Sequence, residues 1–383
     1  MPSTPEPSPT PKALADLTTL RVGGVPHRLV VATTEFALLR AVAEADAAGR
    51  PLLVLGGGSN VVCGEDLSDL VVVRSAETTL KGVAAPDGNG RWFVASAGLP
   101  LDVLAASAAE EDVVGFECLT GIPGTVGATV VQNVGAYGHE VSELIAQVRA
   151  YDRDKGEVVT LTPAELGFGY RDSILKQSMK ERGGYTPRWV VVSVAFKIEK
   201  SELSAPINYP DLAEALGVDV GERAPLMKVR RAVWRVRQAK GLVLDRADHD
   251  TWSAGSFFTN PILCAEHAAA LPADAPRFPA GTAPEGYDLV KTSAAWLMSH
   301  AGIERGAGLV PGPDGQMTLA PAVLNPRVSA TTSTKHVLAL TNRGGATATD
   351  IMALAGAIVQ RVYDTYRVTL TPEPTLVGTA LPG

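Results

Sequence analysis

Apolar and polar residues follow two different periods along the first part of the chain. His27–Ala32, Pro51–Leu55 and Leu70–Arg74 are short apolar runs, which predict strands. Glu35–Ala48 carries apolar residues at helical spacing, which predicts a helix between the first two strands. This order predicts a βαββ unit at the beginning of the fold.

The middle of the chain has more strand than helix. Trp92–Gly98 and Trp189–Ile198 have the β-branched and aromatic content that predicts strands. Ile145–Asp152 and Glu157–Leu161 flank an Asp-Lys-Gly sequence, so they predict a hairpin. Leu101–Glu110 predicts a helix beside them.

Helical patterns dominate the last part. Met227–Ala239 and Thr349–Tyr366 have one apolar face each, and Lys291–His300 is followed by a glycine that fits a helix C-cap. Lys335–Thr341 predicts a strand. Prolines interrupt Val368–Val377, which predicts an edge strand.

Length, charge and composition narrow the class of protein. A chain of 383 residues predicts two or three domains, and its net charge of −7 argues against a general nucleic-acid binder. The three cysteines form no CxxC pair and the six histidines show no metal-ligand spacing, so we expect neither a disulfide framework nor a metal site. The proline-rich first 12 residues predict a disordered, solvated tail rather than a signal peptide. With no apolar run of membrane-spanning length, we expect a cytoplasmic protein.

Two glycine-rich segments, at 56–60 and 115–140, are the most informative features. Glycine lets backbone approach a ligand closely, and consecutive N–H groups in such turns form anion sites. Neither the P-loop nor the Rossmann spacing is present. Each segment alone could be a structural turn, but together they favour one large phosphorylated ligand. The residues of interest are Gly56, Gly57, Gly58, Ser59, Asn60, Gly121, Gly124, Gly127, Asn133, Gly135 and Tyr137.

Polar candidates for chemistry lie far apart in the sequence. Arg171 is a permanently charged donor, or half of a surface ion pair with Asp172. Ser256 precedes two phenylalanines, which suits either a proton donor in a dry pocket or a packed turn. Glu373 is held between prolines, either as a positioned carboxylate or as a surface glutamate.

A basic segment contrasts with the acidic background of the chain. Arg237 and Lys240 are three residues apart and share a helical face. The segment predicts a site for a polyanionic substrate, and a solvated basic face is the alternative. Its members are Lys228, Arg230, Arg231, Arg235, Arg237 and Lys240.

In this order the segments resemble one family, the UDP-N-acetylenolpyruvoylglucosamine reductases, in its longer type I subtype. The resemblance runs from Leu20 to Glu373 and excludes only the N-terminal tail. Its motifs are GGGSN at 56–60, GIPGTVGA at 121–128, QNVGAYG at 132–138, YRDS at 170–173, GSFFTNP at 255–261 and KTSAAWL at 291–297.

The resemblance implies an α+β fold of the vanillyl-alcohol-oxidase/p-cresol-methylhydroxylase type. Two FAD-binding subdomains would cover residues 13–84 and 85–245, with residues 368–383 returning near the second. A substrate-binding domain would cover residues 246–367. The glycine-rich loops would then hold the FAD diphosphate through backbone amides.

The resemblance also implies the UDP-N-acetylmuramate dehydrogenase reaction of peptidoglycan synthesis. NADPH would reduce non-covalent FAD, and UDP-N-acetyl-3-O-(1-carboxyvinyl)-glucosamine would become UDP-N-acetylmuramate. Hydride would pass from flavin N5 to the substrate's C3, and Ser256 would give a proton to C2. Arg171 and a protonated Glu373 would stabilise the enolic intermediate.

The resemblance assigns the other site residues by motif. Those expected at FAD are Gly56, Gly57, Gly58, Ser59, Asn60, Gly121, Pro123, Gly124, Gly127, Ala128, Asn133 and Gly135. Those expected at the substrate are Tyr137, Tyr209, Arg237, Lys240, Asn260 and Lys291. The only partners expected are the small-molecule substrate and NADPH, and we expect a monomer.

Two alternatives and two departures qualify this interpretation. Another flavin oxidase of the same fold would act on a small alcohol, and a nucleotide-binding protein would not need the proton donor Ser256. The loop at 56–60 holds no His or Cys, which favours non-covalent FAD, although Cys63 lies close by. After Glu373 the usual Val-Arg is replaced by Pro374-Thr375, and Gln177–Arg188 is expected to be a long loop with no assigned function.

Overall fold

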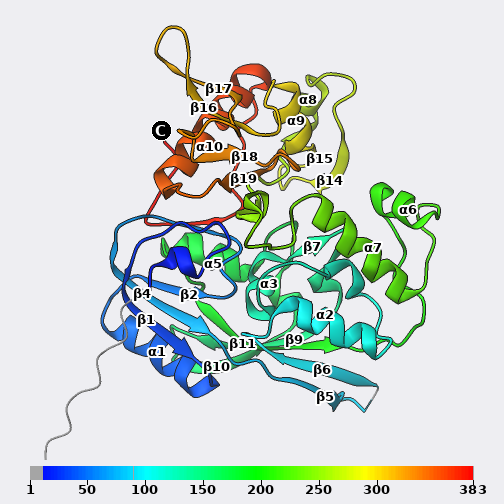
Figure 1. Cartoon of the computed structure of the whole chain (residues 1–383). Helices are drawn as coiled ribbons and strands as arrows, with labels where there is room; N and C mark the ends of the chain where they lie inside the picture. The colour runs from blue at the N-terminus through cyan, green and yellow to red at the C-terminus, as the bar shows by residue number, and fades with distance from the viewer. Residues whose placement is uncertain (1–11, 89, 383) are drawn as a thin grey trace, which may run out of the picture.

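The computed structural model describes residues 12–88 and 90–382, which form three α+β regions (Figure 1). In Figure 1 the blue first region and the cyan-to-green second region lie side by side, and the yellow-to-red third region lies above them. The expected tail at residues 1–12 falls outside the described residues except for Lys12, which is exposed. Within the described residues, no helix is both long and apolar enough to cross a membrane.

The first region is a parallel three-stranded sheet in the order β1-β4-β2, packed against one helix. Thr34 caps that helix, since its Oγ1 accepts from the Ala37 N–H at 3.2 Å. The elements are β1 (Pro26–Ala32), α1 (Glu35–Ala47), β2 (Leu52–Leu55) and β4 (Leu67–Ser75), preceded by the 3-10 helix η1 (Leu14–Asp16). The predicted βαββ unit therefore matches the structure, with an additional short strand, β3 (Val61–Cys63), before β4.

The second region is an antiparallel sheet in the order β10-β9-β11-β6-β5. Its strands are β5 (Leu80–Ala84), β6 (Arg91–Ser96), β9 (Ile145–Asp152), β10 (Glu157–Leu161) and β11 (Trp189–Lys197), with the two-residue strands β7 (Gly135–Ala136) and β8 (His139–Glu140) nearby. Its helices are α2 (Leu101–Glu110), α3 (Val126–Gln132), α4 (Pro163–Leu166), α5 (Ile174–Arg182), α6 (Pro210–Leu216) and α7 (Leu226–Ala239), with the 3-10 helices η2 (Glu117–Leu119) and η3 (Val141–Glu143).

The third region combines a five-stranded sheet, β12-β19-β18-β16-β17, with a three-stranded sheet, β13-β15-β14. Its strands are β12 (Ser253–Ser256), β13 (Ile262–Cys264), β14 (Phe278–Thr282), β15 (Asp288–Lys291), β16 (Ala307–Pro311), β17 (Met317–Pro321), β18 (Ala330–Thr332) and β19 (Ala339–Asn342). Its helices are α8 (Ala265–Ala269), α9 (Ala294–His300) and α10 (Ala348–Tyr366), with the 3-10 helix η4 (His249–Thr251) before β12.

Apolar cores join the regions as well as filling them. Val42 and Val73 of the first region pack in one buried cluster with Val190 and Val192 of β11. The core of the third region likewise includes Val62 of β3. Burial of apolar surface between two regions stabilises their contact, so these shared clusters hold the three regions in one arrangement.

Several elements differ from the sequence prediction. Gln177–Arg188 is not a loop throughout, since α5 runs to Arg182 and ends at Gly183 in the left-handed conformation. Lys291 ends β15, and the following helix begins only at Ala294, where Ser293 provides the cap. Strand β19 begins at Ala339 instead of at residue 335.

Strand pairing also differs from the expected division of the chain. The returning segment, 368–383, was expected near the second region, and its Glu373 does contact Arg171 of that region at 3.2 Å, while its strand β20 (Thr375–Val377) pairs in parallel with β3 of the first. Strand β5 (Leu80–Ala84), expected within 13–84, pairs with β6 of the second sheet. The remaining boundaries stay predictions.

Candidate active site

A single large cleft of about 1350 Å³ is lined by residues from all three regions. The loop after β2, the loop before α3, the C-terminal end of α7 and strand β12 all contribute to its wall, as does Glu373. The volume is larger than that of a typical pocket for one drug-sized ligand. The cleft therefore has room for a dinucleotide and a second ligand.

The two glycine-rich loops touch each other at one side of this cleft. A Cβ on Gly57 would lie 2.7 Å from the Gly124 Cα, so position 57 has no room for a side chain at this crossing. The Ser59 Oγ donates to the Pro123 carbonyl oxygen at 2.8 Å and joins the loops directly. Gly58 and Gly124 have φ of 66° and 129°, which glycine adopts without strain.

Most of the residues predicted at FAD line this cleft, and three do not. Those that line it are Gly56, Gly57, Gly58, Ser59, Asn60, Pro123, Gly124, Ala128 and Gly135. The Gly121 N–H donates to the Asp102 carboxylate at 2.8 Å, and Gly127 packs against Ala97. Asn133 is 1% exposed, and its Nδ2 donates to the Glu140 carboxylate at 2.7 Å and to the Gly169 carbonyl oxygen at 2.9 Å. Gly127 lines a narrower cavity beside the cleft, whereas Gly121 and Asn133 are held by contacts within the protein.

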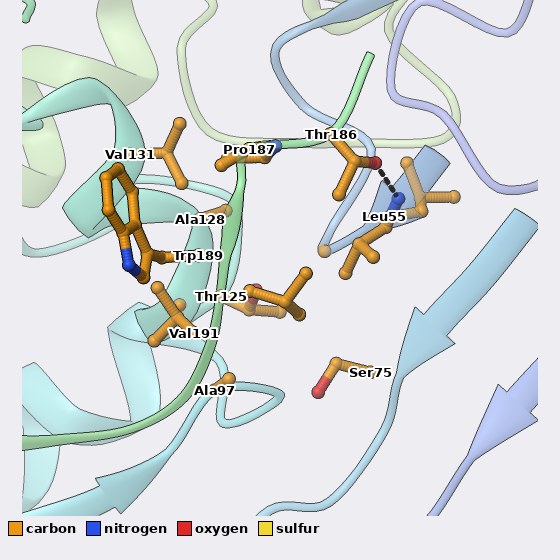
Figure 2. Close-up of a pocket in the computed structure, with 14 residues that line it drawn as sticks. Leu55, Ser75, Ala97, Thr125, Ala128, Val131, Thr186, Pro187, Trp189 and Val191 are labelled. Atoms are coloured by element: carbon orange, nitrogen blue, oxygen red, sulfur yellow. Dashed lines mark hydrogen bonds between the residues drawn. The ribbon is translucent and has the colours of Figure 1, made fainter. Parts of the chain in front are cut away.

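A narrower cavity of about 50 Å³ adjoins the cleft (Figure 2). Figure 2 shows Thr125 and Ala128 at the start of α3 on one side, with Trp189 and Val191 of β11 nearby. Thr186 closes another side, where its Oγ1 accepts from the Val54 N–H at 2.8 Å. Thr186 belongs to the segment without a predicted function, so that segment contributes to the cavity wall.

Backbone pairing brings two of the catalytic candidates close together. Ser256 ends β12, and the next residue, Phe257, accepts from the Glu373 N–H at 2.8 Å through its carbonyl oxygen. Phe258 pairs with Pro372 in an isolated bridge. Phe257 and Phe258 are both fully buried, so this junction is fixed by apolar packing.

Arg171, from the loop before α5, completes the group. Its Nε lies 3.2 Å from the Glu373 Oε1, and its Nη2 donates to the Gly135 carbonyl oxygen at 2.8 Å. Its backbone has φ of 53°, in the left-handed region that non-glycine residues rarely adopt. The structure thus brings Arg171, Ser256 and Glu373, from three distant segments, to the same cleft.

Opposing effects set the protonation of Glu373. Burial raises the pKa of its carboxyl, while the charges of Arg171 and Lys176 lower it. The net pKa is above the usual range of a glutamate. A protonated carboxyl can donate a hydrogen bond, whereas a carboxylate can only accept one.

The substrate candidates line the same cleft. The rings of Tyr137 and Tyr209 meet edge to face with centroids 5.5 Å apart, and burial raises the pKa of Tyr137 to about 12. Lys240 forms an ion pair with Asp211 at 2.8 Å. Arg237 is 8% exposed, and its Nη2 donates to the Leu242 carbonyl oxygen at 3.0 Å.

Asn260 and Lys291 meet around Tyr170, next to Arg171. The Asn260 N–H donates to the Tyr170 hydroxyl at 3.4 Å, and the Lys291 Nζ lies 4.4 Å from the centre of the Tyr170 ring. The Asn260 Oδ1 accepts from the Ala294 N–H at 3.0 Å. Tyr170 is thus a cleft residue that the sequence analysis included only as part of a motif.

The basic segment divides between two surfaces. Only Arg237 and Lys240 line the cleft, whereas Lys228, Arg231 and Arg235 are exposed on the other face of α7. Arg230 lies between, with its guanidinium 4.0 Å from the Asp102 carboxylate. The interpretation as a polyanion site therefore applies to only part of the segment.

Arg305, Lys335 and His336 are among the cleft residues that were not predicted. They come from loops of the third region, where no sequence motif pointed to them. The nearby charges of Lys240, Arg305 and Arg237 and, above all, burial lower the pKa of His336 to about 4. The His336 Nδ1 accepts from the Leu338 N–H at 3.4 Å, which leaves Nε2 as its protonated nitrogen.

The described residues fit a bound flavin dinucleotide. The crossing loops present glycine backbone to the cleft, with no carboxylate among residues 56–60 or 121–128 to repel a diphosphate. Gly255, beside Ser256, has φ of 73°, and a Cβ there would enter open space within the cleft wall. A planar ring could approach the backbone at that point.

Comparisons with known proteins agree with this geometry. The family profile described as "FAD binding domain" matches residues 26–162, and "UDP-N-acetylenolpyruvoylglucosamine reductase, C-terminal domain" matches residues 246–377. The chain is 45% identical to the UDP-N-acetylenolpyruvoylglucosamine reductase of Streptomyces coelicolor, with 96% of this chain and 90% of that protein covered. It is 46% identical to that of Mycobacterium marinum, with 96% and 94% covered. A solved structure of the Thermus caldophilus enzyme superposes with a TM-score of 0.60 at 24% identity, over 96% and 98% of the two chains.

Proposed function

Because this chain belongs to the UDP-N-acetylenolpyruvoylglucosamine reductase family and is an FAD-dependent reductase that forms UDP-N-acetylmuramate, we propose that Arg171, Ser256 and Glu373 carry out its chemistry. NADPH is the hydride donor of this reaction. The observation that supports these roles is the meeting of three distant segments around Glu373. Its backbone binds Phe257 next to Ser256, and its carboxyl lies 3.2 Å from Arg171.

The glycine-rich loops would hold FAD by its diphosphate. FAD supplies the hydride transfer between NADPH and the enolpyruvyl double bond. The backbone amides of Gly57, Gly58 and Gly124 are candidates to bind the diphosphate, and the narrow cavity beside α3 is the candidate site for one end of the dinucleotide. Arg237 and Lys240 would bind the diphosphate of the sugar nucleotide on the other side of the cleft.

Arg171 and Glu373 would stabilise charge on the substrate. When hydride adds to the substrate's C3, negative charge develops at C2 and in the neighbouring carboxylate. The fixed guanidinium of Arg171 would attract that charge, and a protonated Glu373 would donate a hydrogen bond to it. Both groups are oriented before the substrate binds, so little reorganisation is needed during the reaction.

Ser256 would deliver the proton that completes the reaction. It lies at the cleft end of β12, against fully buried phenylalanines. In this role the Ser256 Oγ gives its proton to the substrate's C2 and is reprotonated from water or another cleft donor. Location in the cytoplasm and a monomeric state are further parts of this proposal.

A Ser256→Ala variant tests the assignment. We expect NADPH to bleach the flavin of this variant at nearly the normal rate, while turnover with the sugar nucleotide falls about 10²-fold or more. Stopped-flow absorbance measures the two half-reactions separately. Thr259→Ala, three residues away and outside the cleft lining, is the control and should keep normal turnover. Normal turnover in the Ser256 variant would exclude this serine as the proton donor.

A further inference from the structure

Lys176 lies beside the Arg171–Glu373 pair but does not line the cleft. It belongs to the first turn of α5. Its Nζ donates to the Arg171 carbonyl oxygen at 2.9 Å and to the Gln132 Oε1 at 3.0 Å. Both acceptors belong to the protein, so the ammonium group holds other residues in place instead of awaiting a ligand.

The carbonyl that Lys176 binds belongs to a residue with an uncommon backbone conformation. Arg171 has φ of 53°, which side-chain sterics disfavour unless the surroundings hold it there. Gly169 and Asp172 exchange two backbone hydrogen bonds around this turn, at 3.0 and 3.1 Å. Lys176 adds a charge-assisted bond from the following helix, and such bonds are stronger than neutral ones.

The conformation of this turn determines where the Arg171 guanidinium points. The side chain leaves the turn so that Nε reaches Glu373 at 3.2 Å and Nη2 reaches the Gly135 carbonyl oxygen at 2.8 Å. A rotation of the Arg171 backbone would move both contacts. Through its bond to the Arg171 carbonyl, Lys176 therefore affects how the Arg171 side chain is oriented toward Glu373.

Lys176 also acts on Glu373 through its charge. Among the influences on the pKa of Glu373, burial raises it, and the charges of Arg171 and then Lys176 lower it. The effect is mutual, because Glu373 favours the charged form of Lys176, whose pKa burial lowers. Removing the ammonium would leave Glu373 with one nearby cation and a higher pKa.

We propose that Lys176 is a positioning residue of the reductase, which fixes the turn at Arg171 through one hydrogen bond and balances the charge beside Glu373. The inference rests on the proposed roles of Arg171 and Glu373. Lys176, which lies outside the cleft, would thus align the Arg171 guanidinium and the Glu373 carboxyl inside it.

A Lys176→Met variant removes the hydrogen bonds and the charge while keeping most of the side-chain length. We expect flavin reoxidation by the enolpyruvyl sugar nucleotide to slow about 10-fold or more, because small displacements of aligned groups are costly. Flavin reduction by NADPH should change less than about twofold, since that step does not need the proposed charge stabilisation. Lys180→Met is the matched control, because Lys180 is exposed on the same helix one turn later, and both of its half-reactions should stay near normal.

A second readout does not depend on turnover. Infrared difference spectra of the oxidised holoenzyme follow the carbonyl band of protonated Glu373, which Glu373→Gln identifies by its disappearance. In Lys176→Met the titration midpoint of that band should move to higher pH, whereas Lys176→Arg should return it close to the wild-type value. Thermal unfolding of each variant shows whether the fold is retained.

The outcomes separate this inference from the function it rests on. The inference is wrong if Lys176→Met behaves like Lys180→Met, or if it slows both half-reactions equally and leaves the Glu373 band in place. If instead the wild-type protein is reduced by NADPH but the sugar nucleotide does not reoxidise it, the proposed catalytic roles fail before Lys176 is tested.

Discussion

Individual residues in the cleft and next to it have backbone conformations that only the folded chain enforces. Arg171, Asn133 and Tyr137 all have positive φ without being glycine, and all three lie on the segments around the catalytic pair. Such conformations cost energy and persist where surrounding contacts enforce them. Ordered hydrogen bonds at Arg171 and Asn133 supply that enforcement here.

His336 should make the free energy of unfolding depend on pH, and a substitution should remove this dependence. Its pKa of about 4 in the fold, against 6.5 for a free histidine, means that the unfolded chain binds more protons between these values. Stability should therefore fall as pH decreases from 6.5 to 4, with a cost of up to about 2 kcal/mol at pH 5. In His336→Gln this part of the acid sensitivity should disappear, as measured by urea unfolding at pH 7 and pH 5. An identical loss in variant and wild type would contradict the prediction.

The sequence predicted Arg171, Ser256 and Glu373 as site residues because each lies in a recognisable motif, but no motif pointed to Lys176 or His336. The Lys176 bond to the Arg171 carbonyl is local, but the other neighbours of Lys176, Gln132 and Glu373, belong to distant segments. The charges that act on His336 likewise come from Lys240, Arg305 and Arg237, and no local pattern contains such neighbours. The same limit applies to Asn133. Its amide looked available in the sequence, yet folding commits it to Glu140 and Gly169.

At the scale of elements, the contact between the two glycine-rich loops forms one side of the cleft. Local apolar patterns were sufficient to predict α1, α2, α7 and the β9–β10 hairpin, because each buries one regular face. They failed for α5, whose sequence is mostly polar and buries only Leu175 and Ser178. They also misplaced the start of α9, where Ser293 provides the cap beyond the end of β15.

Gly57→Ala tests the crossing. The added Cβ would lie 2.7 Å from the Gly124 Cα, and backbone on the other side cannot move away as a flexible side chain would. We expect the loops to separate, with at least a 10-fold loss of FAD affinity and a destabilisation of about 1–3 kcal/mol. Flavin fluorescence titration and thermal unfolding measure the two effects. Gly184→Ala, at a site with nothing within 4 Å and ordinary φ, should change neither. Full flavin affinity in Gly57→Ala would show that the crossing is not needed.

At the scale of the whole molecule, one returning strand links the parts of the cleft. β20 follows Glu373 and pairs with β3, and the Thr375 N–H donates to the Asn60 carbonyl oxygen at 3.0 Å. The glycine-rich loop at 56–60 and the proposed catalytic carboxyl of Glu373 are thus joined through the backbone of residues 373–375. The sequence predicted an edge strand here, but its partner could not be found, since pairing across more than 300 residues leaves no local signal.

Val377→Ala tests this link, because Val377 is fully buried against the first region. The cavity should cost about 1–3 kcal/mol of unfolding free energy. Because β20 anchors both ends of the cleft, flavin affinity and turnover should fall together. Equilibrium unfolding, flavin titration and steady-state turnover measure these effects, and Val83→Ala on the exposed strand β5 is the control. If stability falls while flavin affinity and turnover stay unchanged, β20 does not align the site.

The pairing of the late strand β20 with the early strand β3 matters for the order in which the ribosome makes the parts of the cleft. Ribosomes make the glycine-rich loops early, and they make Glu373 only after all the other described helices and strands except β20. The loop at 56–60 and strand β3 therefore gain their backbone partners in β20 only when the last part of the chain has been made. Any message cut short before codon 373 would yield a polypeptide that lacks the catalytic carboxyl and the strand that holds it in place.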